Sequence, residues 1–176
     1  MIYQGQYMDS YIEIEEMLRP HFLDSSVLVK LVIHEPGSDV LRQYFGSHSW
    51  FVTSPLCISE AINVVKRKRG KLTDEQCFAA LWELLWPFRG GSKIQLTREN
   101  LGSTEVLFGA RDLSDRYRID FVDALQLYLL TRESLARYCD GSRAVLISAD
   151  GALIKAARRE GLLVWDCVHE PSPPMP

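Results

Sequence analysis

The chain has 176 residues, 47% of them hydrophobic and 24% charged, which suits one globular domain with a substantial core. Its net charge of −3 and pI near 5.8 exclude a protein that coats nucleic acid through overall charge, so any such contact must be local. Four widely spaced cysteines form no C-x-x-C pair, and the sequence shows no apolar run of about 18 residues and no charged-then-apolar leader pattern. We therefore expect a cytoplasmic protein with reduced thiols, no membrane span and no signal peptide.

The first part of the chain predicts short apolar strands between helices. Asp9 or Ser10 caps a helix that ends near Pro20, and Glu35-Pro36-Gly37 separates two later helices. In chain order we expect a helix within residues 1–20, a strand at 21–23, helices over 26–33 and 38–45, a strand at 51–53, and a helix over 54–69 with Pro55 at its first position.

The remainder continues the alternation. Thr73 is a predicted N-cap, Pro87 ends the helix it begins, and Gly161 closes the last helix. In order we expect that capped helix, a strand at 93–97, helices over 101–116 and 121–131, a strand at 144–148, a helix over 150–161 and a strand at 162–166. Short apolar strands separated by helices predict an α/β fold with three layers, in which helices cover both faces of a central, mainly parallel sheet.

Several acids occupy the same kind of place in this pattern. Asp24 follows the first strand, Asp150 follows AVLIS, and Asp123 lies in the first turn of a helix with Asp120 three residues earlier. In an open parallel sheet, strand ends and the helix starts that follow them gather at one edge, where ligands bind. These acids can therefore converge from distant parts of the chain.

Glu60 is a different case, because the helix around it is almost wholly apolar as far as Val65. The polar residues Ser59, Glu60 and Asn63 form one narrow strip on a helical wheel. We expect Glu60 to point inward or into a cleft, where an unpaired carboxylate is costly and a cation would relieve it.

Each acid also has a simpler interpretation. Asp24, Asp120 and Asp150 suit helix N-caps, and Glu60 taken alone suits a solvated helix position. The combination favours a shared site: two carboxylates ~4 Å apart repel by ~4 kcal/mol at an effective dielectric of 20, so a cluster binds protons or a metal. A set of carboxylate oxygens suits Mg²⁺ or Mn²⁺ rather than zinc.

Four segments, in this order and spacing, resemble the PIN-domain nucleases, and within them the VapC-type toxins of prokaryotic toxin–antitoxin pairs. They are LDSSVLVKLVIHEPGSD, SEAINVV, DFVDALQLYLL and ISADGALIKAARREGL, and the resemblance spans residues 21–167. It implies a PIN-like nuclease domain over that range, preceded by a helical extension at 1–20 and followed by a disordered Pro-rich tail at 168–176. Relatives begin almost at the first strand, and we hypothesise as an alternative that translation starts at Met17.

The resemblance also implies roles for individual residues. It makes Asp24, Glu60, Asp123 and Asp150 the catalytic metal ligands for Mg²⁺ or Mn²⁺. It implies that Ser26, Ser148 and Asp120 support these ligands through neighbouring contacts. The implied activity is metal-dependent endonuclease cleavage of RNA phosphodiester bonds, with a bound metal that activates water.

Basic residues suggest how RNA is held. Lys66 and Arg67 close the helix that carries Glu60, and Arg67 lies on nearly the same face; Arg118 precedes Asp120. We predict that all three contact phosphate, although cations at a helix C-terminus also complement its dipole.

The resemblance implies a homodimer silenced by a small antitoxin protein. Phe78, Trp82 and Trp86 recur every four residues, and this aromatic stripe, with Leu81 and Leu85, indicates core packing or a protein interface more than base stacking. The competing interpretation is a non-catalytic PIN-fold module that binds RNA or protein. Such modules usually lose acids, and none of the four matched acids is lost here.

Overall fold

A five-stranded sheet forms the centre of the molecule. The structure is a computed structural model that describes residues 19–48, 50–69, 73–85, 93–97, 102–132 and 144–173. Its strands are β1 (His21–Leu23), β2 (Phe51–Thr53), β3 (Ile94–Leu96), β4 (Val145–Ser148) and β5 (Leu163–Asp166). They lie in the order β3-β2-β1-β4-β5, and each neighbouring pair is parallel.

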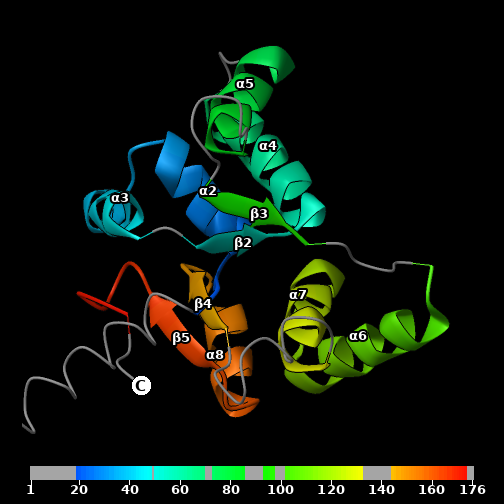
Figure 1. Ribbon diagram of the computed structural model, residues 1–176. Helices are drawn as coiled ribbons and strands as arrows, with labels where there is room; N and C mark the ends of the chain where they lie inside the picture. Colours follow the sequence, from blue (N-terminus) through cyan, green and yellow to red (C-terminus); the bar gives the residue numbers. More distant parts are fainter. Residues whose placement is uncertain are drawn as a thin grey trace, which may run out of the picture.

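Seven helices lie within the described residues. They are α2 (Ser25–Val32), α3 (Ser38–Ser47), α4 (Pro55–Arg69), α5 (Asp74–Leu85), α6 (Thr104–Tyr117), α7 (Phe121–Arg132) and α8 (Gly151–Arg159). Figure 1 shows α2, α4 and α5 in one group and α6, α7 and α8 in another. The chain runs outward from β1 to β3 and then in the opposite direction from β3 through β4 to β5. Because connections between parallel strands are as a rule right-handed, this reversal puts the two groups on opposite faces. The predicted three-layer α/β fold is confirmed.

The central strands are buried on both faces, which explains their unbroken apolar sequences. Every residue of β1, β2 and β4 is buried, whereas only Ile94 is buried in the edge strand β3. Phe22, Phe51 and Trp165 are among the largest side chains with no exposed surface. Burial of each such side chain contributes roughly 2–3 kcal/mol, so the sheet that positions the strand ends is held firmly.

Local capping chemistry sets the element boundaries. α4 begins with Pro55, as predicted, and Thr73 accepts from the backbone N–H of Gln76 while the Gln76 side chain accepts from that of Thr73. Gly161 follows α8 with φ of +76°, the left-handed conformation that ends helices. The helix predicted over 101–116 instead begins at Thr104, because Ser103 is its N-cap.

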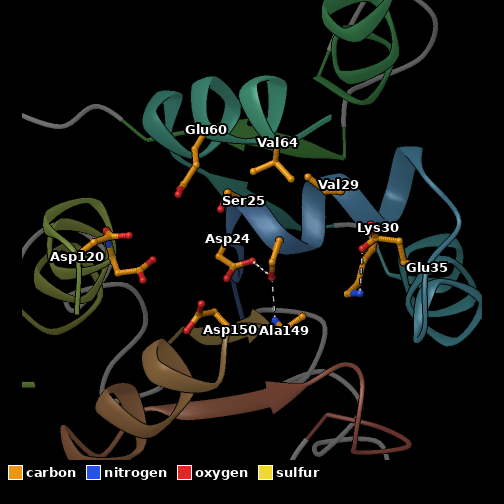
Figure 2. A pocket seen from close by; sticks show the side chains of 12 residues that line it. Asp24, Ser25, Val29, Lys30, Glu35, Glu60, Val64, Asp120, Ala149 and Asp150 are labelled. Carbon is orange, nitrogen blue, oxygen red and sulfur yellow. Dashed lines mark hydrogen bonds and ion pairs between the residues drawn. The ribbon is translucent and has the colours of Figure 1, made fainter. Parts of the chain in front are cut away.

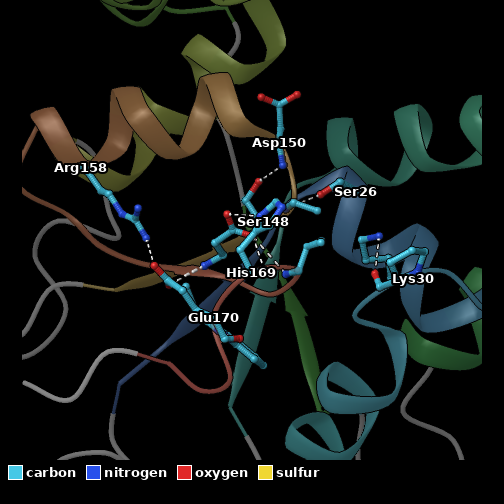
Figure 3. A network of polar contacts seen from close by, with 12 residues as sticks. Ser26, Lys30, Ser148, Asp150, Arg158, His169 and Glu170 are labelled. Carbon is cyan, nitrogen blue, oxygen red and sulfur yellow. Dashed lines mark hydrogen bonds and ion pairs between the residues drawn. The ribbon is translucent and has the colours of Figure 1, made fainter.

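The two ends of the chain are described in part. Residues 1–18, with most of the predicted N-terminal helix and the Met17 start, lie outside the described residues. After β5 the chain turns back, and Glu170 accepts from the backbone N–H of Asp166 and from Arg158, while the Trp165 indole donates to its carbonyl (Figure 3). The division into extension, domain and tail stays a prediction. Among the helices of the described ranges, none combines the length and the hydropathy of a membrane span.

Candidate active site

Six carboxylates line one pocket, and the five besides Glu35 belong to the acids singled out from the sequence. The pocket has a volume of about 300 Å³ and is lined by Asp24, Ser25, Ser26, Val29, Lys30, Glu35, Glu60, Val64, Asp120, Asp123, Ala149 and Asp150. Figure 2 shows Asp24, Glu60, Asp120 and Asp150 around it, on three different sides. The four acids predicted as a set, together with Asp120, therefore share one cavity.

The strand order explains this convergence. β1 and β4 are neighbours, yet the chain leaves them toward opposite edges of the sheet, and this reversal leaves a crevice outside their carboxyl ends. Asp24 directly follows β1, and Asp150 follows β4 after one intervening residue. The two acids thus lie where ligands bind in open parallel sheets.

Asp24 is buried and held from several directions. Its Oδ1 accepts from the Ser26 hydroxyl at 2.7 Å and from the Val27 N–H at 2.9 Å, and its Oδ2 accepts from the Ser148 hydroxyl at 2.5 Å. The side chain is therefore both the N-cap of α2 and part of the pocket wall. The two interpretations are compatible.

The two serines also fix the loop after β4. Ser26 Oγ accepts from the Ala149 N–H, and Ser148 Oγ accepts from the Asp150 N–H, each at 2.9 Å (Figure 3). Each hydroxyl donates to Asp24 and accepts from this loop. Two hydroxyls thus set the relative positions of Asp24 and Asp150.

Asp150 is the N-cap of α8. Its Oδ1 accepts from the N–H groups of Ala152 at 2.7 Å and Leu153 at 2.9 Å. Both capping bonds use Oδ1, so capping leaves Oδ2 available.

Glu60 reaches the pocket from α4. Its Oε2 is buried and has no hydrogen-bond partner among the described residues. The predicted inward orientation is confirmed, because the carboxylate lines the pocket beside Val64, one turn later on α4. A buried oxygen without a donor is costly, and a cation or donor in the pocket would satisfy it.

Asp120 and Asp123 come from the start of α7. Asp120 Oδ1 accepts from the Asp123 N–H at 2.9 Å, which is an N-cap bond, as predicted. Burial, and then the charges of Asp120, Asp150, Asp24 and Glu60, raise the pKa of Asp123 to about 8. The metal-free pocket therefore holds a proton near neutral pH.

Asp24 has a raised pKa for a related reason. Burial raises it to about 6 against the hydrogen bonds from Ser148, Ser26 and Val27, and the charge of Asp150 adds to the rise. The pocket thus has more negative charge than it can hold ionised. It suits a cation, because a positive ion would favour the charged form of each acid.

The donor chemistry of the pocket fits a hard divalent ion. All six lining acids offer oxygen, the ligand type that Mg²⁺ and Mn²⁺ take. Within the described ranges, no group of three or more His, Cys, Asp or Glu side chains is arranged to hold a metal ion as it stands. The fit therefore rests on charge, burial and the unsatisfied Glu60 oxygen, and the side chains must draw together around an ion.

Two charged lining residues were not predicted as site residues. Lys30 on α2 and Glu35 in the following turn face the pocket, and their side chains are 3.3 Å apart. Lys30 is the one charged residue in the apolar run VLVKLVI. It carries the same signal as Glu60, a polar side chain in an apolar helix, although a lysine in such a run can also extend to solvent.

The predicted RNA-contacting cations lie outside the pocket lining. Lys66 pairs with Asp74, and Arg67 donates from Nε to the Asn63 carbonyl at 3.2 Å. Arg118 is exposed and ends α6 with φ of +53°. Their contact with RNA stays a prediction.

The aromatic stripe is partly described. Phe78 and Trp82 are 47% and 37% exposed, and their rings stack with centroids 5.1 Å apart. Trp86 and the side chains of Leu81 and Leu85 lie outside the described residues. The two described rings are not core residues, which leaves the interface interpretation as a prediction.

Comparison with known proteins gives matches in structure only. No family model and no curated protein matches the chain. The crystal structure of PAE2754 from Pyrobaculum aerophilum matches with a TM-score of 0.55 and 17% identity, over 84% of this chain and 90% of that one. Mycobacterium tuberculosis VapC20, a toxin that cleaves the sarcin–ricin loop, matches with a TM-score of 0.56 and 16% identity, over 77% of this chain and 93% of its own.

The chain therefore has a PIN-like α/β fold, which it shares with these two structures. The resemblance in sequence is thereby confirmed at the level of fold, across most of both matched chains. At such low identity a shared fold does not transfer an activity, so function has to be argued from the pocket. In this fold Asp24, Glu60, Asp120, Asp123 and Asp150 line a pocket at the carboxyl edge of the sheet.

Proposed function

We propose that this protein is a metal-dependent endoribonuclease that hydrolyses RNA phosphodiester bonds. The observation that carries the proposal is the acid pocket, where carboxylates from four distant segments meet and one buried Glu60 oxygen has no described partner. A nuclease needs such a cluster, because metal-bound water and the scissile phosphate both carry charge that a divalent ion stabilises.

In this proposal four acids bind the metal and three neighbouring residues orient them. Asp24, Glu60, Asp123 and Asp150 hold Mg²⁺ or Mn²⁺, which when bound lowers the pKa of water and stabilises charge on the phosphate. Ser26 and Ser148 keep Asp24 oriented through their hydrogen bonds. Asp120 assists by capping α7 and so placing Asp123.

We infer the substrate and partners by analogy with the structural neighbour VapC20. The neighbour VapC20 is an RNA-cleaving toxin, which supports RNA as the substrate and a toxin–antitoxin pair as the context. We infer that the protein acts in the cytoplasm as a homodimer, controlled by an antitoxin protein. Lys66, Arg67 and Arg118 are the proposed outer phosphate contacts, and Phe78 with Trp82 is the proposed partner surface.

The test is a cleavage assay on total RNA with Mg²⁺, with Mn²⁺ and with EDTA. Wild type, Asp24→Asn and Asp150→Asn are compared with Asp112→Asn, which removes an exposed α6 acid outside the pocket. We expect metal-dependent cleavage by wild type and the control, and a loss of at least ~100-fold in both pocket variants. Equal activity in all four proteins would refute the assignment.

The alternative is a non-catalytic PIN-fold module that binds RNA or protein. It is favoured by one observation: the described acids are not grouped to hold an ion without side-chain movement. Such a module would bind RNA equally well with and without divalent ions, and it would leave RNA uncut in every condition of the same assay.

A further inference from the structure

The acid pocket has a cationic end. The side chain of Lys30 is only 8% exposed, and Lys30 is the one basic residue among those that line the pocket. Figure 2 shows Lys30 and Glu35 on one side of Asp24 and Asp120 on the other. Lys30 is six residues beyond Asp24, or ~9 Å along α2 at 1.5 Å per residue.

The Lys30 ammonium retains hydrogen-bonding capacity. An ammonium has three N–H donors, and here one binds Glu35 Oε2 at 3.3 Å and another binds the Pro36 carbonyl at 2.9 Å. The described residues supply no acceptor for the third. A buried ammonium with an unused donor, beside a cavity, is suited to an anionic ligand.

The surroundings fix this ammonium in place. Ser38 Oγ accepts from the Glu35 N–H at 2.9 Å and donates to the Lys30 carbonyl at 3.0 Å, which ties the turn to α2. Gly37 at φ +86° lies so close to the Cys167 carbonyl oxygen that a Cβ would be 2.4 Å from it. A preorganised lysine loses little side-chain entropy when it binds a ligand.

We propose that Lys30 is a phosphate anchor, which holds an RNA backbone phosphate next to the one that is cleaved. This inference rests on the proposed nuclease function. The charge balance of the pocket supports it: besides Glu35, five acids line the pocket and repel a phosphodiester chain. The Lys30 ammonium attracts a phosphate at the end of the pocket that lies away from these acids. Glu35 competes with that phosphate for the ammonium.

A purely structural role for Lys30 predicts different behaviour. If Lys30 only braces the turn at 33–38, loss of its charge lowers stability without changing the number of phosphate contacts. Glu35→Gln would then weaken the same brace. In the anchor role Glu35→Gln releases the ammonium and strengthens RNA binding, so the two roles predict opposite signs.

The experiment measures binding of a fluorescein-labelled single-stranded RNA by anisotropy, over a series of KCl concentrations with Mg²⁺. An Asp150→Asn background keeps the RNA intact, and Lys30→Met, Lys30→Arg and Glu35→Gln are added to it. Lys155→Met is the matched control, because Lys155 is exposed on α8 and does not line the pocket. Thermal melting of every variant is recorded beside binding.

We expect Lys30→Met to weaken binding about tenfold and to reduce the slope of log Kd against log [KCl] by ~0.7, the loss of one phosphate contact. Lys30→Arg keeps the slope, Glu35→Gln tightens binding severalfold, and Lys155→Met changes neither quantity. An unchanged salt slope in Lys30→Met, or weaker RNA binding in Glu35→Gln, would overturn the phosphate-anchor role of Lys30. The nuclease proposal would still stand if wild type cleaves RNA in a metal-dependent way. If Lys30→Met does not fold, the direction in which Glu35→Gln changes RNA affinity decides whether Lys30 is an anchor. If wild type shows no metal-dependent cleavage, the nuclease proposal itself is refuted.

Discussion

The Ser148 hydroxyl donates a hydrogen bond to Asp24 Oδ2, joining residues 124 positions apart in the sequence. The bond exists because β1 and β4 are paired in register, with Leu23 beside Ile147. The acid that follows one strand is thus oriented by the last residue of its neighbour. The geometry of the pocket therefore depends on the order of the strands.

Removal of this hydroxyl is the first prediction. Ser148→Ala leaves the buried Asp24 without one donor, so we expect a stability loss of about 1–2 kcal/mol and an Mn²⁺ affinity roughly tenfold lower. Urea unfolding and Mn²⁺ titration measure the two effects. Ser114→Ala is the matched control, because it removes a hydroxyl that donates to the Ile119 carbonyl at 2.7 Å outside the pocket. Equal Mn²⁺ affinity in both variants would show that Ser148 does not act on the site.

The metal-free protein should lose stability as the pH rises. The pKa values of Asp24 and Asp123, raised to about 6 and about 8, mean that the folded state binds protons more tightly than the unfolded state does. Their contribution to the free energy of unfolding is fully present below about pH 4. It is lost as the pH rises through 6 for Asp24 and through 8 for Asp123, and the part from Asp24 is roughly 3 kcal/mol.

Urea midpoints in EDTA between pH 4 and 9 test this dependence. Asp123→Asn should flatten the upper part of the curve, and Mg²⁺ should restore stability to wild type at pH 8 but much less to the variant. A wild-type urea midpoint that stays constant between pH 6 and 8 in EDTA would contradict the raised pKa of Asp123.

His21 should act in the opposite direction. It is buried, its Nδ1 lies 3.4 Å from the Trp50 carbonyl, and its Nε2 lies 2.6 Å from the Tyr44 hydroxyl. Burial lowers its pKa to about 4, so the folded state resists protonation and stability falls as the pH drops from 6.5 toward 4. The expected loss is roughly 2–3 kcal/mol.

The variant His21→Gln isolates this effect, because glutamine does not titrate. The difference in unfolding free energy between pH 6.5 and pH 4 should be smaller in the variant than in wild type. An identical difference would remove His21 as the source of the acid sensitivity.

Gly109 permits close packing of α6 on α7. A Cβ there would lie 2.0 Å from Cε2 of Tyr128, a ring that is only 6% exposed and cannot easily move away. We expect Gly109→Ala to cost about 1–3 kcal/mol, measured by urea unfolding. Gly46→Ala in α3 meets nothing within 4 Å and should stabilise by roughly 0.5–1 kcal/mol. Stabilisation by both alanines would contradict the packing.

Much of the fold could be predicted, because local patterns determine it. The strands at 21–23 and 51–53 are found where the apolar runs placed them, and Glu60 was found from its polar strip on an apolar helix. The double role of Asp24 and Asp150, as cap and as pocket wall, could not be decided from one residue's neighbours.

Other features depend on long-range pairing. The bonds that join Ser26 to Ala149 and Ser148 to Asp24 require the position of β4 beside β1, which no local pattern specifies. Lys30 was missed because a single lysine in an apolar run resembles a side chain that reaches solvent. Its burial follows from its packing beside Glu35 and Pro36.

Calorimetric titration of the protein with Mn²⁺ tests the central claim most directly. Wild type should bind the ion, and Asp24→Asn, Glu60→Gln, Asp123→Asn and Asp150→Asn should each weaken binding by at least about tenfold, while Asp112→Asn does not. Wild-type affinity in all four pocket variants would contradict the claim that these acids hold a divalent cation together.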